Sequence, residues 1–277
     1  FTEDTELNQL GYGQEYQIKY TLEPVDATAS LLTWASDNPE VISVDKTGKL
    51  KVHTTKTASA VITASYGPVV QNVTVTVADG RFWYSLGNGL GNGLDNNWYL
   101  DGNNASVVSS DGNKTTVQMG SGYRGDLWLA RSGKGKIVNV TPADYRYFAI
   151  KVGFKSQLVP GKNKPNGCIK LEIFDDGIKK IGPEYFGTGG DANNRYEILG
   201  ASEISTTEPN VLYYDLQSKY KTVTPTDWNQ VFDLVQCKFV IADFPETAQT
   251  YDLYWIRSFK SIEELQAFVD SENNTNE

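Results

Sequence analysis

Alternation of hydrophobic and polar residues runs through most of this chain and predicts β-strands rather than helices. Between residues 73 and 77, three valines alternate with two threonines, which is the period of a strand that buries one face. The same alternation recurs at residues 148–154, 169–174, 211–216, 239–241 and 251–256. The pattern predicts an all-β protein whose strands pack around a core.

Two segments break the strand period and predict short helices. Thr224 and Pro225 supply an N-cap followed by proline at the first helical position, and apolar residues follow at helical spacing as far as Val235. Near the C-terminus, Ser261 and Glu264 form a capping box ahead of an apolar stripe. We expect the C-terminal helix to pack on the β-sandwich.

An ordered string of strand and turn residues marks the first part of the chain. Trp34 precedes a Ser-Asp-Asn-Pro turn at 36–39, a Val-Ile-Ser-Val strand at 41–44 and an Asp-Lys-Thr-Gly turn at 45–48. This string resembles the bacterial immunoglobulin-like domains of group 2 found in intimin and invasin stalks. The resemblance implies a small β-sandwich over residues 1–79 that acts as a spacer on an exported surface protein. Trp34 is expected to fill its core.

A second domain is expected from residue 80 to residue 277, after a boundary at the Ala-Asp-Gly sequence of 78–80. Its regular strands are separated by long, polar, glycine-rich loops, which predicts a larger jelly-roll β-sandwich with a short C-terminal helix. The stretch 251–265 is similar to the end of jelly-roll domains in surface lipoproteins of glycan-degrading gut bacteria, and to the last strand of carbohydrate-binding modules. That resemblance implies a carbohydrate-binding function.

The charge balance narrows the class of partner. The chain carries 34 acidic and 25 basic residues, for a formal net charge of −9, and such a protein repels the phosphate backbone of nucleic acids. It contains no apolar run of about 18 residues, so no segment is predicted to span a membrane. The sequence begins at Phe1 without a signal peptide. We expect an export signal and a lipid anchor outside it, and an extracellular location at the cell surface.

Few residues suit metal or nucleophilic chemistry. The single histidine, His53, excludes a Ser-His-Asp triad in the second domain and any multi-histidine metal site. Cys168 and Cys237 fit either one disulfide or two buried thiols. The Asp- and Asn-rich turns at 101–104, 175–177 and 191–194 offer oxygen ligands for a structural calcium ion, although Asx turns account for them equally well. No other cofactor is expected.

Aromatic residues in the predicted loops are interleaved with Gly, Asn and Asp. An exposed ring matches the flat apolar face of a sugar, while Asn, Asp and Arg supply directional hydrogen bonds. A Gly-Asn-Gly-Leu repeat at 87–94 precedes the first such group and lacks the Lys-Ser or Lys-Thr of a phosphate-binding loop. The predicted carbohydrate-binding residues are Asn97, Trp98, Tyr99, Tyr123, Arg124, Asp126, Tyr185 and Tyr196.

Together these features favour a non-catalytic surface protein that binds a polysaccharide or oligosaccharide through its jelly-roll domain. Two alternatives stay open. A glycoside hydrolase or polysaccharide lyase needs a pair of carboxylates, which 34 acidic residues always provide. A protein-binding adhesin would use the same exposed rings. No residue is singled out as catalytic, and the sequence does not reveal which glycan is bound.

Overall fold

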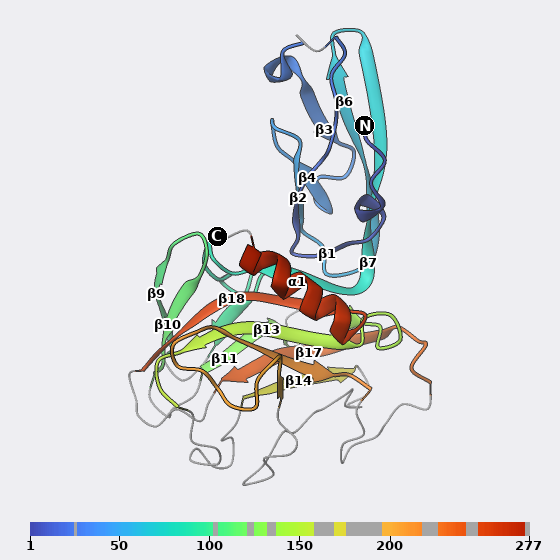
Figure 1. Ribbon diagram of the computed structural model, residues 1–277. Coiled ribbons are helices and arrows are strands. Elements are labelled where there is room, and N and C mark those ends of the chain that lie inside the picture. The colour runs from blue at the N-terminus through green and yellow to red at the C-terminus, as the bar shows by residue number, and fades with distance from the viewer. Residues whose placement is uncertain are drawn as a thin grey trace.

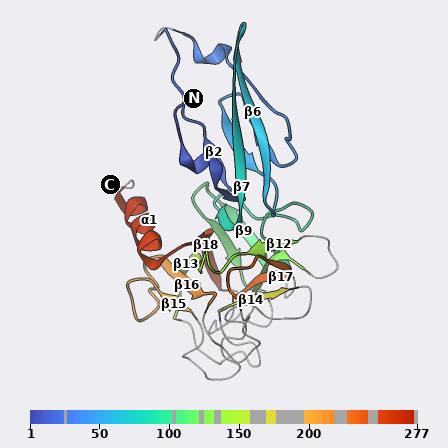
Figure 2. The ribbon, with the colours of Figure 1, turned by 90° about the vertical axis from the view of Figure 1, so that its right-hand side faces the viewer.

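The computed structural model describes residues 1–24, 27–101, 105–120, 125–131, 137–157, 169–175, 196–217, 227–241 and 249–274. Two β-rich lobes stand end to end, with the N-terminal one above (Figures 1 and 2). We call residues 1–77 the upper lobe and residues 81–274 the lower lobe. Antiparallel sheets dominate the described residues and an α-helix closes the chain, which confirms the predicted all-β class. No helix among the described residues is long and apolar enough to cross a membrane.

The upper lobe packs two sheets face to face. One consists of β3 (Thr33–Ser36), β6 (Ala58–Tyr66) and β7 (Val69–Ser85), with β1 (Leu10–Tyr12) parallel to β7; the other consists of β2 (Glu15–Gln17), β5 (Lys49–Val52) and β4 (Ile42–Val44). Short 3-10 turns occupy Thr5–Asn8 and Ala29–Leu31. Leu50 and Ile62 are fully buried between the sheets. Trp34 is half-buried and packs on this core, over Gly48, whose φ of 81° suits the predicted turn.

The lower lobe is a second, larger sandwich. One sheet runs β15 (Glu197–Ile198), β16 (Asn210–Asp215), β13 (Tyr147–Phe154), β18 (Thr250–Phe259) and β7, with β10 (Thr115–Gln118) and β9 (Ser106–Ser110) continuing beside β18. The other runs β12 (Val138–Val140), β17 (Phe232–Ile241), β11 (Gly125–Ala130) and β8 (Tyr99–Asp101), and β14 (Lys170–Asp175) also pairs with β17. Phe148 and Phe239 join the two sheets, with ring centroids 5.6 Å apart.

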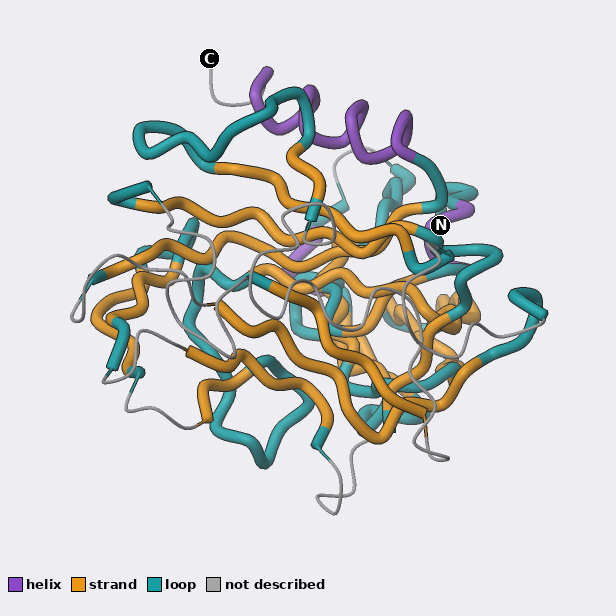
Figure 3. Tube along the Cα trace, turned by 90° about the horizontal axis from the view of Figure 1, so that it is seen from below, coloured by secondary structure: helices purple, strands orange, loops and turns teal. Residues whose placement is uncertain are grey.

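Helix α1 (Ile262–Asn274) covers the outer face of β13 and β18, and Figure 3 shows it along one side of the lower lobe. The predicted capping box forms in part: Glu264 N donates to Ser261 Oγ at 3.2 Å, whereas the Glu264 carboxylate accepts from Lys260 N at 2.6 Å, one residue before the N-cap. Phe268 packs edge-on against Trp255, with centroids 5.6 Å apart.

The second predicted helix is wrong where the structure describes it. Residues 232 to 235 begin strand β17, whose pairing with three neighbouring strands outweighs the local helical spacing. Its predicted start, Thr224-Pro225, lies outside the described residues. The unbroken alternation predicted at residues 251–256 is also wrong. A bulge in β18, opposite Lys151 and Val152, turns Trp255 towards α1 and Ile256 into the core.

Strand β7 belongs to both lobes. Leu10 and Tyr12 of β1 pair with Val77 and Phe82, so β7 carries extra residues at this point and bends between the lobes (Figure 1). Gly80 lies within the bend with a φ of 69°. The domain boundary expected at residues 78–80 therefore falls inside a continuous strand.

Hydrogen bonds and ion pairs also join the two lobes. Arg81 Nη2 contacts Glu6 Oε1 at 2.6 Å, and Thr55 Oγ1 donates to the carbonyl of Ile137 at 2.6 Å. One connected core contains most of the buried hydrophobic residues of both lobes, and a smaller cluster lies under α1. The position of one lobe on the other is thus fixed by packing as well as by chain connection.

Candidate functional site

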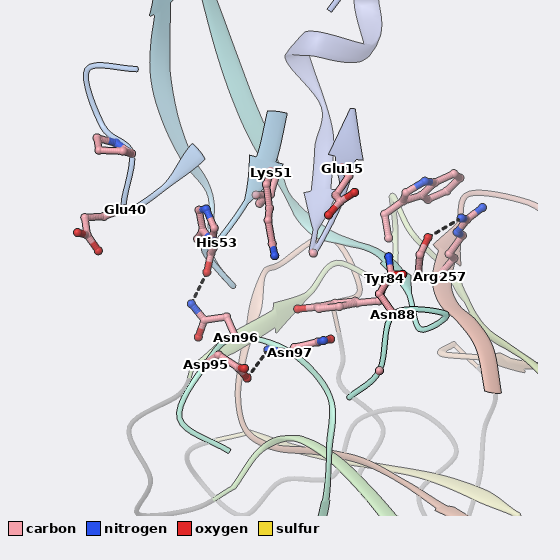
Figure 4. A pocket seen from close by; sticks show the side chains of 16 residues that line it. Glu15, Glu40, Lys51, His53, Tyr84, Asn88, Asp95, Asn96, Asn97 and Arg257 are labelled. Atoms are coloured by element: carbon pink, nitrogen blue, oxygen red, sulfur yellow. Dashed lines mark hydrogen bonds between the residues drawn. The ribbon is translucent and has the colours of Figure 1, made fainter. Parts of the chain in front are cut away.

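A cleft of about 580 Å³ opens where the two lobes meet (Figure 4). Its upper wall comes from the ends of β2 and β5 and from the turn before β4, and its lower wall from β7, β18 and the loop that follows β7. Most of its side chains carry hydrogen-bonding groups: Glu15, Glu40, Lys51, His53, Tyr84, Ser85, Asn88, Asp95, Asn96, Asn97 and Arg257.

The glycine- and asparagine-rich loop at 87–97 supplies much of the lower wall. Its first glycine, Gly87, packs so closely that a Cβ would lie 2.2 Å from the carbonyl oxygen of Gly112. Asn96 Nδ2 donates to the carbonyl of His53 in the upper lobe, and the N–H of Asn97 donates to Asp95 Oδ1 at 3.2 Å. The first bond ties the loop to the opposite wall and the second lies within the loop, and the side chains of Asn88, Asn96 and Asn97 line the cleft.

The ring of Tyr84 forms the floor of the cleft. Tyr84 is 2% exposed, and Gly13 of the upper lobe lies against its ring so closely that a Cβ there would be 2.2 Å away. Burial raises the pKa of Tyr84 well above its ordinary value, so the hydroxyl stays protonated. Within the described part of the chain, Tyr84 Oη has no hydrogen-bond partner. The hydroxyl oxygen is closed off from solvent, so Tyr84 contributes its ring to the floor of the cleft and not its polar group.

Some charged side chains around the cleft form ion pairs and others do not. Glu15 contacts Lys49 at 2.5 Å. Lys51 points into the cleft and makes no ion pair with the described residues. His53 bonds to Ser43 Oγ at 2.7 Å, and its pKa is lowered by burial and, to a lesser extent, by the charge of Lys51, which keeps the imidazole neutral at pH 7.

Arg257 closes one end of the cleft. Its guanidinium lies 4.4 Å from the ring centroid of Trp83 and 4.3 Å from that of Phe268, and it contacts Ser85 Oγ at 3.4 Å. Burial lowers the pKa of Arg257 to about 10, so the group is still cationic at neutral pH. Its Nε has no partner among the described residues.

The family profile described as domain of unknown function (DUF4979) matches residues 89–265, well over half of the chain. The protein belongs to the DUF4979 family. The match runs from the cleft loop to the start of α1 and leaves out the upper lobe, whose resemblance to immunoglobulin-like domains stays a prediction. A search of curated proteins finds no match.

The DUF4979 protein also has a distant likeness to a solved structure, described as the structural basis for the promiscuous specificity of carbohydrate-binding modules from the β-sandwich superfamily. The two are 11% identical, with a TM-score of 0.31 over 91% of this chain and 94% of the other.

Among the predicted site residues, Asn97 lines the cleft of the DUF4979 protein. Trp98 is fully buried, with its ring centroid 5.5 Å from that of Phe239, and Tyr99 is 5% exposed. The prediction of exposed rings at these two positions is wrong. Trp98 fills the core at the entrance to β8, while the loop before it reaches the cleft.

Asp126 lies in a buried ion network instead of an exposed loop. Strand register places Tyr99, Trp128, Lys238 and Glu172 in one row across β8, β11, β17 and β14. Lys238 Nζ contacts Glu172 at 2.8 Å and Asp126 at 3.2 Å, and it lies 4.5 Å from the centroid of Trp128. Asp126 is 6% exposed, so its carboxylate is committed to the protein interior and the exposed role predicted for it is wrong.

The other predictions meet the structure only in part. Tyr196 is half-buried and packs against the core, whereas Tyr123, Arg124 and Tyr185 lie outside the described residues. So does Cys168; Cys237 is a fully buried free thiol, whose pKa burial raises. The three turns predicted to bind calcium lie partly outside the described residues. Within the described residues, no cluster of three or more His, Cys, Asp or Glu side chains could hold a metal ion.

Sequence reasoning missed Lys51, Tyr84 and Asn96. The Asn-Asn pair at 96–97 gave a signal for Asn96, since both amides sit in the same polar loop. Nothing in the local pattern marks Lys51 or Tyr84, because each lies on a regular strand and gains its role only when the lobes meet.

Proposed function

We propose that this DUF4979 protein binds a glycan without cleaving it, and that the glycan lies in the cleft between the lobes. The observation that carries the proposal is the set of three side-chain amides, those of Asn88, Asn96 and Asn97, that line one polar cleft. An amide both donates and accepts, which matches neighbouring hydroxyls on a sugar ring. Ligand sites in proteins commonly enclose about 300–1,000 Å³, and the cleft volume of about 580 Å³ lies in that range.

The polar lining favours a sugar over an apolar ligand. An apolar molecule here would cover the amides without giving them hydrogen bonds, whereas a polyhydroxylated molecule satisfies them. The carboxylates support binding over hydrolysis. Glu15 is paired with Lys49, and Asp95 accepts from the backbone of Asn97, so both are engaged in structural contacts.

We further propose an exported protein that acts at the cell surface, with residues 1–79 as an immunoglobulin-like module that presents the jelly-roll at 80–277. The support is the sequence resemblance of both parts. The cleft gives the N-terminal module a second role, because Lys51 and His53 form part of the wall.

The test is isothermal titration of the full chain with a panel of soluble plant, algal, microbial and animal polysaccharides. Asn97→Ala is expected to weaken binding about tenfold, since an amide that makes two hydrogen bonds to a sugar contributes roughly 1–2 kcal/mol. The matched control is Asn92→Ala, an exposed asparagine of the same loop whose side chain, among the described residues, accepts from the N–H of Leu94.

Three outcomes would contradict the proposal. Release of new reducing ends from any polysaccharide would show an enzyme. Binding to host proteins with no binding to glycans would show an adhesin. Equal loss of binding in the Asn92 and Asn97 variants would move the site away from the cleft.

A further inference from the structure

The cations of the cleft lack anionic partners. Lys51 and Arg257 make no ion pair with the described residues. Glu272, the acid that influences Arg257, instead accepts from Lys151 Nζ and Trp255 Nε1, each at 3.1 Å. A buried guanidinium without a carboxylate is costly unless something else supplies the negative charge.

The acids of the cleft do not fill this role. Glu15 is held by Lys49, and Asp95 by the backbone of Asn97. Glu40 lies at the rim, on the side away from Arg257 (Figure 4). The inner part of the cleft therefore presents two kinds of donor, the Lys51 ammonium and the loop amides.

We infer that the cleft selects an acidic glycan, in which the carboxylate of a uronic acid residue accepts a hydrogen bond from Lys51 Nζ. The inference rests on the proposed function, because it names the class of glycan for the same site. Arg257 adds positive potential at the end of the cleft, while the amides of Asn88, Asn96 and Asn97 bind the hydroxyls of the sugar. Since the whole chain has a net charge of −9, recognition of an anion has to come from such local groups.

The experiment compares each acidic glycan with its own neutral form. The probes are oligosaccharides of polygalacturonate, alginate and hyaluronan, each before and after reduction of the carboxylates to primary alcohols. We expect the acidic form of the bound glycan to bind about tenfold more tightly than its reduced form, because a charged hydrogen bond contributes more than a neutral one. The preference should shrink as salt is added.

Two variants locate the carboxylate. Lys51→Met should lower affinity for the acidic form about tenfold and leave the reduced form unchanged. Tyr84→Phe should change neither affinity, because its hydroxyl is buried below the surface of the cleft. The control is Lys46→Met, which removes the same charge from an exposed turn outside the cleft.

The outcomes separate this inference from the proposed function. Equal affinity for acidic and reduced forms, or equal effects of Lys46→Met and Lys51→Met, overturns the acidic-glycan inference and leaves glycan binding intact. Binding of neutral polysaccharides without binding of acidic ones would likewise overturn the acidic-glycan inference and leave glycan binding intact. If no glycan of either kind binds, both proposals fall.

Discussion

The hydroxyl of Tyr12 in the upper lobe donates a hydrogen bond to the side-chain carbonyl of Asn139 in β12 of the lower lobe. The N–H of Gly80 donates to both oxygens, at 3.1 Å to Tyr12 and 3.0 Å to Asn139. Burial raises the pKa of Tyr12, which keeps its hydroxyl a donor. The junction between the lobes is thus built from buried, hydrogen-bonded polar groups.

Removing the Tyr12 hydroxyl should weaken this junction. Tyr12→Phe leaves the Asn139 carbonyl with one donor fewer in a buried site, so we expect the free energy of unfolding to fall by about 1–2 kcal/mol. Urea denaturation measures it. Tyr66→Phe, at the far end of the upper lobe, is the control, because no hydrogen bond of its hydroxyl is found among the described residues. Equal effects of the two substitutions would contradict the role given to Tyr12.

A methyl group at Gly80 should be far more damaging than one at Gly67. Both glycines have positive φ, 69° and 58°, so alanine strains the backbone at either site. At Gly80 the new Cβ would also lie 2.3 Å from Thr141 Oγ1, whereas nothing lies within 4 Å at Gly67. We expect losses of about 1 kcal/mol for Gly67→Ala and about 2–4 kcal/mol for Gly80→Ala. Similar melting temperatures for the two variants would disprove the steric argument.

Trp98→Ala should unfold the protein more readily rather than act on binding alone. The ring is fully buried between Tyr84 and Phe239, and truncation of such a ring costs about 3–5 kcal/mol. Leu94→Ala, in the same loop, is the control, since Leu94 is 89% exposed and should change stability by less than about 0.5 kcal/mol. A stable Trp98→Ala variant with weakened glycan binding would restore the original prediction of an exposed ring.

Asp252 makes stability depend on pH. Burial by itself would raise the pKa of this carboxyl, but hydrogen bonds from Lys114, Thr116 and Lys155 outweigh burial and lower it. In the unfolded chain, Asp252 therefore takes up its proton at a higher pH, about 4, than it does in the folded protein. The stabilisation is complete above that pH and is lost as the pH falls through the lower folded value.

Asp252→Asn should remove this dependence. We expect the variant to be less stable than the parent by about 1–3 kcal/mol at pH 7, with the difference shrinking as the pH falls below about 4. Urea unfolding at a series of pH values between neutral and acid measures it. A difference that stays constant across the series would show that the carboxylate charge of Asp252 plays no part.

The regular parts of the fold could be predicted from local pattern. Alternation at 148–154 places Phe148 and Ile150 in the core and Ala149 under α1, as the strand period requires. The Ser261 side chain caps the N–H of Glu264, and α1 begins at the next residue after this cap, Ile262. Both signals involve only neighbours in the chain, which is why they could be read from the sequence.

What the sequence missed depends on contacts between distant segments. The apolar spacing up to Val235 predicted a helix, but pairing with neighbouring strands makes this segment part of β17. The bulge in β18 places Trp255 on the opposite face of the sheet from the one that simple alternation predicts. Trp98 follows a glycine-rich loop and looked exposed, but its burial is decided by Phe239, far along the chain. The cleft could not be predicted from the sequence for the same reason, because Lys51 and Tyr84 come from different lobes and line one cleft only in the folded protein.

The passage of β7 through both lobes has a mechanical consequence. Its 17 residues correspond to a contour length of about 56 Å at the usual rise of a strand. A pull applied to one lobe reaches the other along this strand, where ladders of hydrogen bonds to β6 above and β18 below are loaded in shear. Tension along β7 would then act on the bend at Gly80, which lies between these two ladders.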